Sequence, residues 1–215
     1  MPELTSSADT RQRLLEAAGE VFAEQGFRST TVREICQRAK ANIAAVNYHF
    51  GDKERLYAEV LRYAHRCAME KYPPEQGLAD TAPAAERLEA FIRSFLLRIF
   101  DVGSLAWHGK LIAHEMIEPT QALDALVETD IRPRAVQLTA IVRALVRPEV
   151  SEAQVYLCAM SIVGQCMFYH HARPLITRLN PAQRFTPADV EALAQHITQF
   201  SLSALRHLAT PEEDV

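Results

Sequence analysis

The sequence lacks several patterns that are typical of catalytic and metal-binding proteins. Only 7 of its 215 residues are glycine, and it contains no glycine-rich phosphate loop or nucleophile elbow. None of the cysteines is part of a CxxC pair, and Cys158 and Cys166 would lie about 12 Å apart along one helix, too far for a disulfide. We therefore expect buried free thiols, no metal and no cofactor.

The chain also lacks a strong charge of one sign and a long run of apolar residues. Its net charge is −4, and residues 1–63 hold nine basic and nine acidic residues, so non-specific attraction to DNA should be modest. The most apolar stretch, 153–169, is shorter than a membrane span and contains Gln165. The first residues carry no basic-plus-apolar signal, so we expect a cytoplasmic protein without a membrane partner.

Helical periodicity is what the sequence does show. No strand-like alternation of useful length follows residue 63, and apolar residues recur at helical spacing, which predicts an all-α fold. We expect a long helix at about 53–71 and, with Pro133 kinking or splitting the third of them, further helices at about 83–101, 104–117, 120–146, 152–172 and 187–208. The first 8 and last 6 residues are polar, so we expect them to be frayed.

Residues 31–53, TVREICQRAKANIAAVNYHFGDK, carry the clearest local pattern. Thr31 and Glu34 have capping-box spacing, which predicts a helix from Val32, and Asn42 is a suitable N-cap for a second short helix. Two short helices joined by about three residues fit a helix-turn-helix. The first would bury the stripe Val32, Ile35, Cys36 and Ala39, and the second would point Ile43, Val46 and Phe50 inward.

The outward residues of the second helix suit a DNA groove. Ala44 and Ala45 would let the backbone approach base edges, whereas Tyr48 and His49 can donate to phosphates and Asn47 lies at the edge of that arc. Asp52 can cap a third helix, whose start would form a phosphate site with Lys53. The alternative is that these helices have no role in DNA binding, because short amphipathic helices with polar outer faces occur in many all-α domains. The cations Arg28, Arg33, Arg38, Lys40 and Lys53 could share one face, with Glu16, Glu20 and Glu24 elsewhere.

The block from Thr10 to Leu61 resembles the N-terminal DNA-binding domain of the TetR/AcrR family of bacterial transcriptional regulators, through AAGEVFAEQGF, TTVREI and NYHFGDKERLY. The resemblance implies a homodimeric repressor that binds double-stranded DNA. It also implies a helix-turn-helix domain at 1–55 and an effector-binding and dimerisation domain at 56–215. It places the DNA contacts on Thr31, Asn42, Ile43, Ala44, Ala45, Asn47, Tyr48, His49 and Lys53. Lys40 departs from the family, which usually has glycine in this turn.

The C-terminal stretches AHEMIEPTQAL, ETDIRPR and SIVGQCMFYHHARP are similar to the CecR-type domain of one branch of this family. This resemblance covers most of residues 84–207 and implies control of export or drug-response genes by a small-molecule effector. The candidate pocket residues combine apolar walls with a few polar groups. They are Phe95, Ile99, Trp107, Leu111, His114, Glu115, Met116, Tyr156, Met160 and Phe168.

Segment 153–169 is apolar nearly all the way round, so we expect it to be buried on two sides. It could pair with the last helix, 187–208, and two such pairs would form a four-helix dimer interface with twofold symmetry. The alternative is an intrachain core. Dimerisation would require a palindromic operator, because two recognition helices must meet the DNA at a fixed spacing.

Histidines leave one other class of function to weigh, an all-α enzyme that uses His114 and Glu115 for acid–base chemistry. That alternative leaves residues 31–53 unexplained. His108 and His114 point in different directions on a helix, as do His170 and His171, so neither pair has the geometry of metal ligands. His170 and His171 also precede Pro174, where we expect the helix to end.

Overall fold

A computed structural model describes residues 7–101 and 107–209, which are mostly helical, and no strand occurs in those ranges. The predicted all-α class is confirmed. The two ends that we expect to be frayed lie outside these residues, except for residues 7 and 8. Positions 104–106 of the predicted helix 104–117 also lie outside them. The chain folds into two compact units, one made of 1–68 with 102–130 and the other of 69–101 with 131–215.

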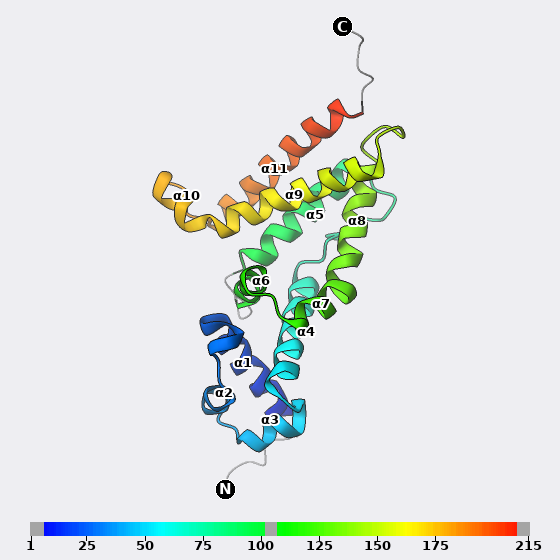
Figure 1. Cartoon of the computed structure of the whole chain (residues 1–215). Coiled ribbons are helices and arrows are strands. Elements are labelled where there is room, and N and C mark those ends of the chain that lie inside the picture. The colour runs from blue at the N-terminus through cyan, green and yellow to red at the C-terminus, as the bar shows by residue number, and fades with distance from the viewer. Residues whose placement is uncertain (1–6, 102–106, 210–215) are drawn as a thin grey trace. The chain divides into compact units, whose positions relative to one another are not determined.

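Unit 1 contains the helix-turn-helix segment (Figure 1). Its helices are α1 (Ser7–Ser29), α2 (Val32–Ala39), α3 (Ile43–Phe50), most of α4 (Lys53–Lys71), α6 (Trp107–Ile117) and α7 (Gln121–Leu126). Helix α1 packs against α2, α3 and α6, and it is interrupted at Gly26 (φ 77°, ψ 169°). The core gathers Leu14, Phe22, Ile35, Val46, Leu56, Tyr57, Val60, Trp107 and Leu111.

Unit 2 is built around α5, which packs against α8, α9 and α11. Its helices are α5 (Ala84–Ile99), α8 (Arg132–Arg143), α9 (Glu152–His171), α10 (Arg173–Leu179) and α11 (Pro187–His207). Leu88, Ile92, Leu138, Val142, Val155, Ala159, Ala194 and Ile197 form much of its core.

Two prolines mark changes between helices. A π-helical turn, η1 (Val127–Ile131), joins α7 to α8, and Pro133 lies in the first turn of α8, so the predicted helix 120–146 is split as expected. Pro174 does more than end α9. It also lies in the first turn of α10, a helix absent from the prediction. Proline is tolerated there because an N–H group in the first turn has no partner within the helix.

Candidate DNA-binding site

The capping box predicted at the start of α2 is present. Thr31 Oγ1 accepts from the N–H of Glu34 (3.3 Å), and Glu34 Oε2 accepts from the N–H of Thr31 (2.9 Å). The Thr31 hydroxyl also donates to Glu34 Oε2 (2.7 Å), and this bond, followed by the backbone bond, holds the pKa of Glu34 below its usual value. These contacts satisfy donors that a helix start leaves open.

The turn between α2 and α3 forms without glycine. Lys40 takes the left-handed conformation (φ 50°, ψ 47°), and its N–H donates to Gln37 O (3.3 Å). The N–H of Ala41 donates to Cys36 O (3.0 Å), so the last carbonyls of α2 have partners. A side chain in this conformation costs about 1 kcal/mol relative to glycine. The departure from the family pattern is therefore accommodated as local strain.

Helix α3 presents a mostly uncharged arc to solvent. The Asn42 side chain caps it by accepting from the N–H of Ala44 (3.0 Å), while Val46 and Phe50 anchor it in the core. The inward orientation predicted for Ile43 is wrong: the residue is 48% exposed, because α3 buries only Val46 and Phe50. Among the other predicted contacts, Thr31, Asn42, Ala44, Asn47 and Tyr48 are exposed, and Ala45, His49 and Lys53 are half-buried.

Lys53 lies at the start of α4, where Asp52 Oδ1 accepts from the N–H of Arg55 (2.7 Å) and so caps the helix as predicted. Lys53 Nζ donates to the carbonyl oxygens of Phe27 (2.8 Å) and Thr30 (2.9 Å), where α1 ends. An ammonium group has three donors, and these two bonds use two of them. The residue joins the end of α1 to the start of α4.

The cations of this region are only partly available to an anionic partner. Arg38 pairs with Glu24 (2.9 Å) and Glu20 (3.5 Å), and Arg28 pairs with Glu118 (3.6 Å). The expected separation of the cations from Glu20 and Glu24 is therefore wrong for Arg38. Arg33 and Lys40 are exposed and form no ion pair with any residue in the described ranges.

The motif described above is matched by a family model. The model described as bacterial regulatory proteins, tetR family, matches residues 14–60. The model of the C-terminal domain of the HTH-type transcriptional dual regulator CecR matches residues 84–205, more than half of the chain. The chain belongs to the TetR family. It is a DNA-binding transcriptional regulator with a CecR-type C-terminal domain.

Full-length relatives agree with this assignment. The chain is 26% identical to the HTH-type transcriptional dual regulator CecR of Shigella flexneri, over 92% of each protein. It is also 26% identical to the HTH-type transcriptional repressor NicS of Pseudomonas putida, over 93% of this chain and 92% of NicS. These relatives are regulators rather than enzymes. AibR, crystallised with isovaleryl coenzyme A and operator DNA, has the same fold, with a TM-score of 0.68, 20% identity and coverage of 89% of this chain and 97% of AibR.

The structure distributes the predicted effector residues of this TetR-family regulator between the two units. Trp107, Leu111, His114, Glu115 and Met116 belong to unit 1, and Phe95, Ile99, Tyr156, Met160 and Phe168 belong to unit 2. Trp107 and Leu111 are part of the core, whereas Met116, Tyr156 and Phe168 are about half exposed. Phe95, Ile99 and Met160 are half-buried against the core of unit 2.

A buried hydrogen-bond network in unit 1 was missed by sequence reasoning. Tyr57 Oη donates to Glu115 Oε1 (2.6 Å), and the N–H of Thr120 donates to Glu115 Oε2 (2.9 Å). Burial, followed by the bond to Glu115, raises the pKa of Tyr57. Tyr57 and Glu115 are 58 residues apart, so no local spacing could have indicated the contact.

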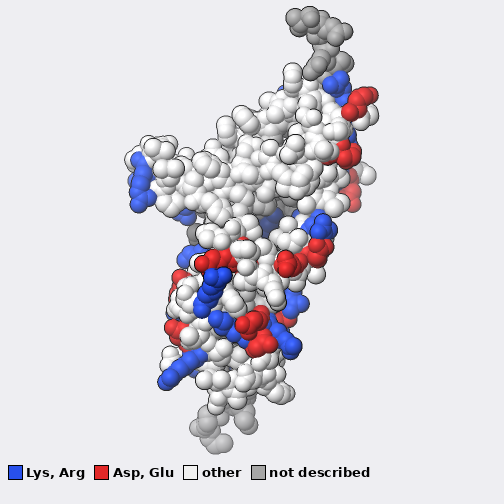
Figure 2. Space-filling model, viewed as in Figure 1, with Lys and Arg blue, Asp and Glu red and all other residues white. Residues whose placement is uncertain are grey.

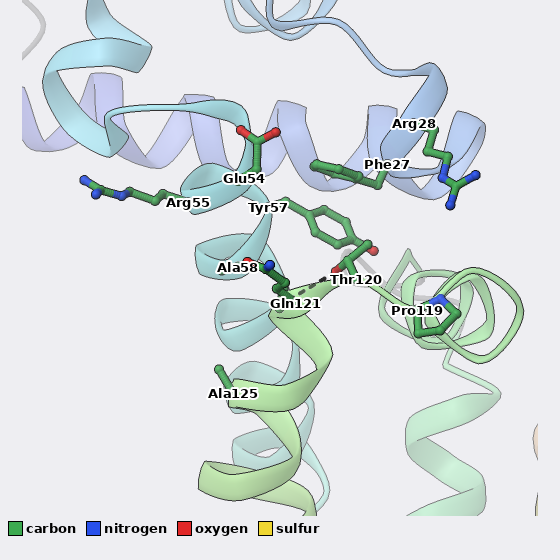
Figure 3. Close-up of a pocket in the computed structure, with 11 residues that line it drawn as sticks. Phe27, Arg28, Glu54, Arg55, Tyr57, Ala58, Pro119, Thr120, Gln121 and Ala125 are labelled. Carbon is green, nitrogen blue, oxygen red and sulfur yellow. Dashed lines mark hydrogen bonds between the residues drawn. The ribbon is translucent and has the colours of Figure 1, made fainter.

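Beside this network is an open cavity of about 580 Å³ that lies within unit 1 (Figure 3). None of the predicted effector residues lines it. The lining comes from the end of α1, the first turns of α4 and the start of α7, namely Phe27, Arg28, Glu54, Arg55, Tyr57, Ala58, Pro119, Thr120, Gln121, Ala122 and Ala125. Periodicity predicts the buried face of each helix, but it does not predict which helix ends come together to line a cavity.

The alternative acid–base pair is not formed. The carboxylate of Glu115 bonds to Tyr57 and Thr120, and His114 Nε2 lies 3.3 Å from Ala23 O. In residues 7–101 and 107–209, no three His, Cys, Asp or Glu side chains are grouped so that they could hold a metal ion. Over the same residues, no helix has the length and apolar character needed to cross a membrane.

Proposed function

We propose that this regulator is a ligand-responsive repressor, which binds a palindromic operator as a homodimer and is released by a small-molecule effector. The exposed arc of α3 is the observation that carries the proposal. Ile43, Ala44, Asn47 and Tyr48 are exposed on it, while Val46 and Phe50 fix the helix from behind. A helix held in this way can enter the major groove without rearranging its own core.

The proposed contacts fall into two groups by chemistry. Ile43, Ala44 and Ala45 offer methyl groups for thymine, and Asn47 can bond to a base edge or a phosphate. Tyr48, His49 and the third donor of Lys53 would bond to phosphates, which set the register on the duplex. Thr31 and Asn42 contribute at the helix starts, where backbone N–H groups favour an anion.

The second subunit would dock on the exposed face of α9. That helix buries Val155, Ala159, Ile162 and Cys166, while Leu157 and Phe168 remain 63% and 57% exposed. Residues 153–172 contain no Lys, Arg, Asp or Glu, and the surface over α9 is white in Figure 2. A Cβ on Gly164 would meet nothing within 4 Å, so another helix could approach closely there. Phe200 of α11 is 60% exposed and would extend the same apolar surface.

Effector and operator would act against each other through the dimer. An effector that favours a dimer with a different spacing between recognition helices weakens operator binding, and the operator weakens effector binding by the same factor. The half-buried Phe95, Ile99 and Met160 of unit 2 support an effector site among the C-terminal helices. Export or drug-response genes are proposed as targets on the CecR-type resemblance alone.

Selection of bound duplexes from a random DNA pool tests the operator. We expect one palindrome to be enriched, and Tyr48→Ala to weaken its binding at least tenfold with unchanged circular dichroism. Gln195→Ala, an exposed change on α11, is the control. No palindrome in the selected pool would refute the proposal.

Light scattering at micromolar concentration tests the dimer. Leu157→Glu should give monomers, because it places a charge in an apolar interface. Leu179→Glu, which changes a 77% exposed leucine on α10, should leave the dimer intact. A wild-type monomer would remove the geometric basis for a palindromic site.

A further inference from the structure

Arg98 is a buried cation on α5 of unit 2 whose hydrogen bonds all go to neutral acceptors. The residue is 5% exposed, and its Nη1 donates to Tyr72 O (3.0 Å) and to Ser94 Oγ. Nε and Nη2 have no hydrogen-bond partner in the described part of the chain, and neither is fully enclosed. Those two nitrogens form the edge of a guanidinium that binds a carboxylate with two parallel hydrogen bonds.

The neighbouring charges do not balance Arg98. No carboxylate of residues 7–101 or 107–209 forms an ion pair with it. The carboxylate that acts on it electrostatically, Glu75, accepts from Gln137 Nε2 (2.8 Å) and pairs with Arg134 (3.5 Å). Two cations therefore share one carboxylate.

Cys166 cannot supply the missing negative charge, although it lies near Arg98. Burial raises the pKa of its thiol to about 12, so the thiol is neutral at ordinary pH. Burial, followed by repulsion from Arg134, lowers the pKa of Arg98 to about 10, which still leaves the guanidinium charged. A buried charge that has no carboxylate of its own is unfavourable, and it fits a site that an anion completes.

The aromatic ring of Phe95 lies next to the guanidinium. The Phe95 ring centre lies 5.6 Å from Arg98 Cζ, and Phe95, Ile99 and Met160 are half-buried against the core of unit 2. A ligand that reaches Arg98 would therefore place its charged end on the guanidinium and its apolar part against Phe95.

We propose that Arg98 is the anion-binding group of the effector site, and that the effector is an apolar organic acid whose carboxylate pairs with Nε and Nη2. This inference deepens the proposed function, since it names the chemical class of the effector. The binding of the acid is a property of unit 2 and can be measured without DNA.

Matched pairs of acids and amides test the proposal on the full chain. The probes are octanoate with octanamide, benzoate with benzamide, and phenylacetate with phenylacetamide. We expect at least one acid to raise the melting temperature of the wild type by several degrees and to bind at least tenfold tighter than its amide. Arg98→Met should abolish this preference.

Arg93→Met is the matched control, because Arg93 lies on the same helix but pairs with Glu89 (3.0 Å) and Glu191 (2.6 Å). It should keep the acid preference. If Arg98→Met fails to fold, Arg98→Lys decides: it retains the charge without the two-pronged donor edge, so the preference should fall at least fivefold. No acid-specific shift in the wild type, or a preference unchanged in the Arg98 variants, would overturn the proposal.

Operator binding, measured in parallel, separates this inference from the proposed function. If the protein binds a palindrome but binds acids and amides equally well, the proposed repressor function stands and the role of Arg98 is refuted. If acids bind through Arg98 but do not change operator binding, the anion site stands and ligand-responsive repression is refuted.

Discussion

Lys53 Nζ donates to the carbonyl oxygen of Phe27 at 2.8 Å and lies 4.4 Å from the centre of the Phe27 ring. The contact joins the end of α1 to the start of α4, and the chain between the two residues contains both helices of the helix-turn-helix. The sequence indicated a cation for a phosphate at this position. The structure adds a support for the segment that carries the recognition helix.

Lys53→Met should therefore act on stability as well as on DNA. Losing two charge-assisted bonds at a half-buried site should lower the free energy of unfolding by about 1–2 kcal/mol, measured by urea denaturation. If the third donor of Lys53 binds a phosphate, the salt dependence of operator binding should also fall by about one unit in slope. Arg33→Met, at an exposed cation, should leave stability within about 0.5 kcal/mol. Equal stability for both variants would contradict the supporting role.

Asn42 can be tested as a helix cap apart from any DNA contact. Asn42→Ala should lower the free energy of unfolding by about 1 kcal/mol, since the N–H of Ala44 loses its acceptor. Asn42→Ser and Asn42→Asp should both keep the cap and the stability. Only Asn42→Asp should weaken operator binding strongly, because it places a negative charge near phosphates. Gel-shift titrations beside thermal melts distinguish the three variants.

The left-handed Lys40 is a site where a smaller residue should stabilise the protein. Lys40→Gly should raise the free energy of unfolding by about 0.5–1 kcal/mol, because glycine adopts φ 50° without strain. Lys40→Val should lower it, since a β-branched side chain fits this conformation poorly. A decrease in stability for the glycine variant would mean that the turn is not strained.

The Tyr57–Glu115 bond predicts a loss of stability from the removal of one oxygen atom. Tyr57→Phe should lower the free energy of unfolding by about 1–3 kcal/mol, because the buried carboxylate loses a donor without a change in packing. Tyr63→Phe, which removes the half-buried acceptor of Gln12, is a suitable comparison and should have a smaller effect. Similar losses in chemical denaturation would indicate that burial does not strengthen the Tyr57 bond.

His170 predicts how stability depends on pH. Burial, followed by repulsion from His171 and Arg173, lowers the pKa of His170 in the folded chain. The unfolded chain, with a histidine pKa of about 6.5, binds the proton more readily, so stability should decrease as the pH falls below that value. His170→Gln should make the decrease shallower, whereas His196→Gln, at an exposed site, should not. Denaturation curves from pH 7.5 to 5 measure the difference.

Local chemistry made much of the recognition motif predictable. Thr31, Asn42 and Asp52 were identified as caps because a cap depends on residues two or three positions away, and all three accept the expected backbone bonds. Ile43 was placed wrongly because periodicity assumes a partner along the whole inner face of a helix. Helix α3 is only eight residues long, and it buries Val46 and Phe50 alone.

Long-range neighbours were not predictable in the same way. The effector residues were grouped by their apolar character, but α6 packs against α1, and α5 packs against α8, α9 and α11. The contacts of Tyr57 with Glu115 and of Arg98 with Tyr72 depend on which segments of the chain come together in space. The spacing of residues in one sequence does not show which distant segments come into contact.

The pairing of Arg38 with Glu20 and Glu24 has a consequence for how the regulator competes for its site in a cell. Every stretch of genomic DNA offers phosphates, and a protein with many unpaired cations spends most of its time on the wrong ones. Here part of the positive charge is already neutralised within the protein. We expect fewer molecules to be held on random sequence, so that a small number of copies can keep the operator occupied.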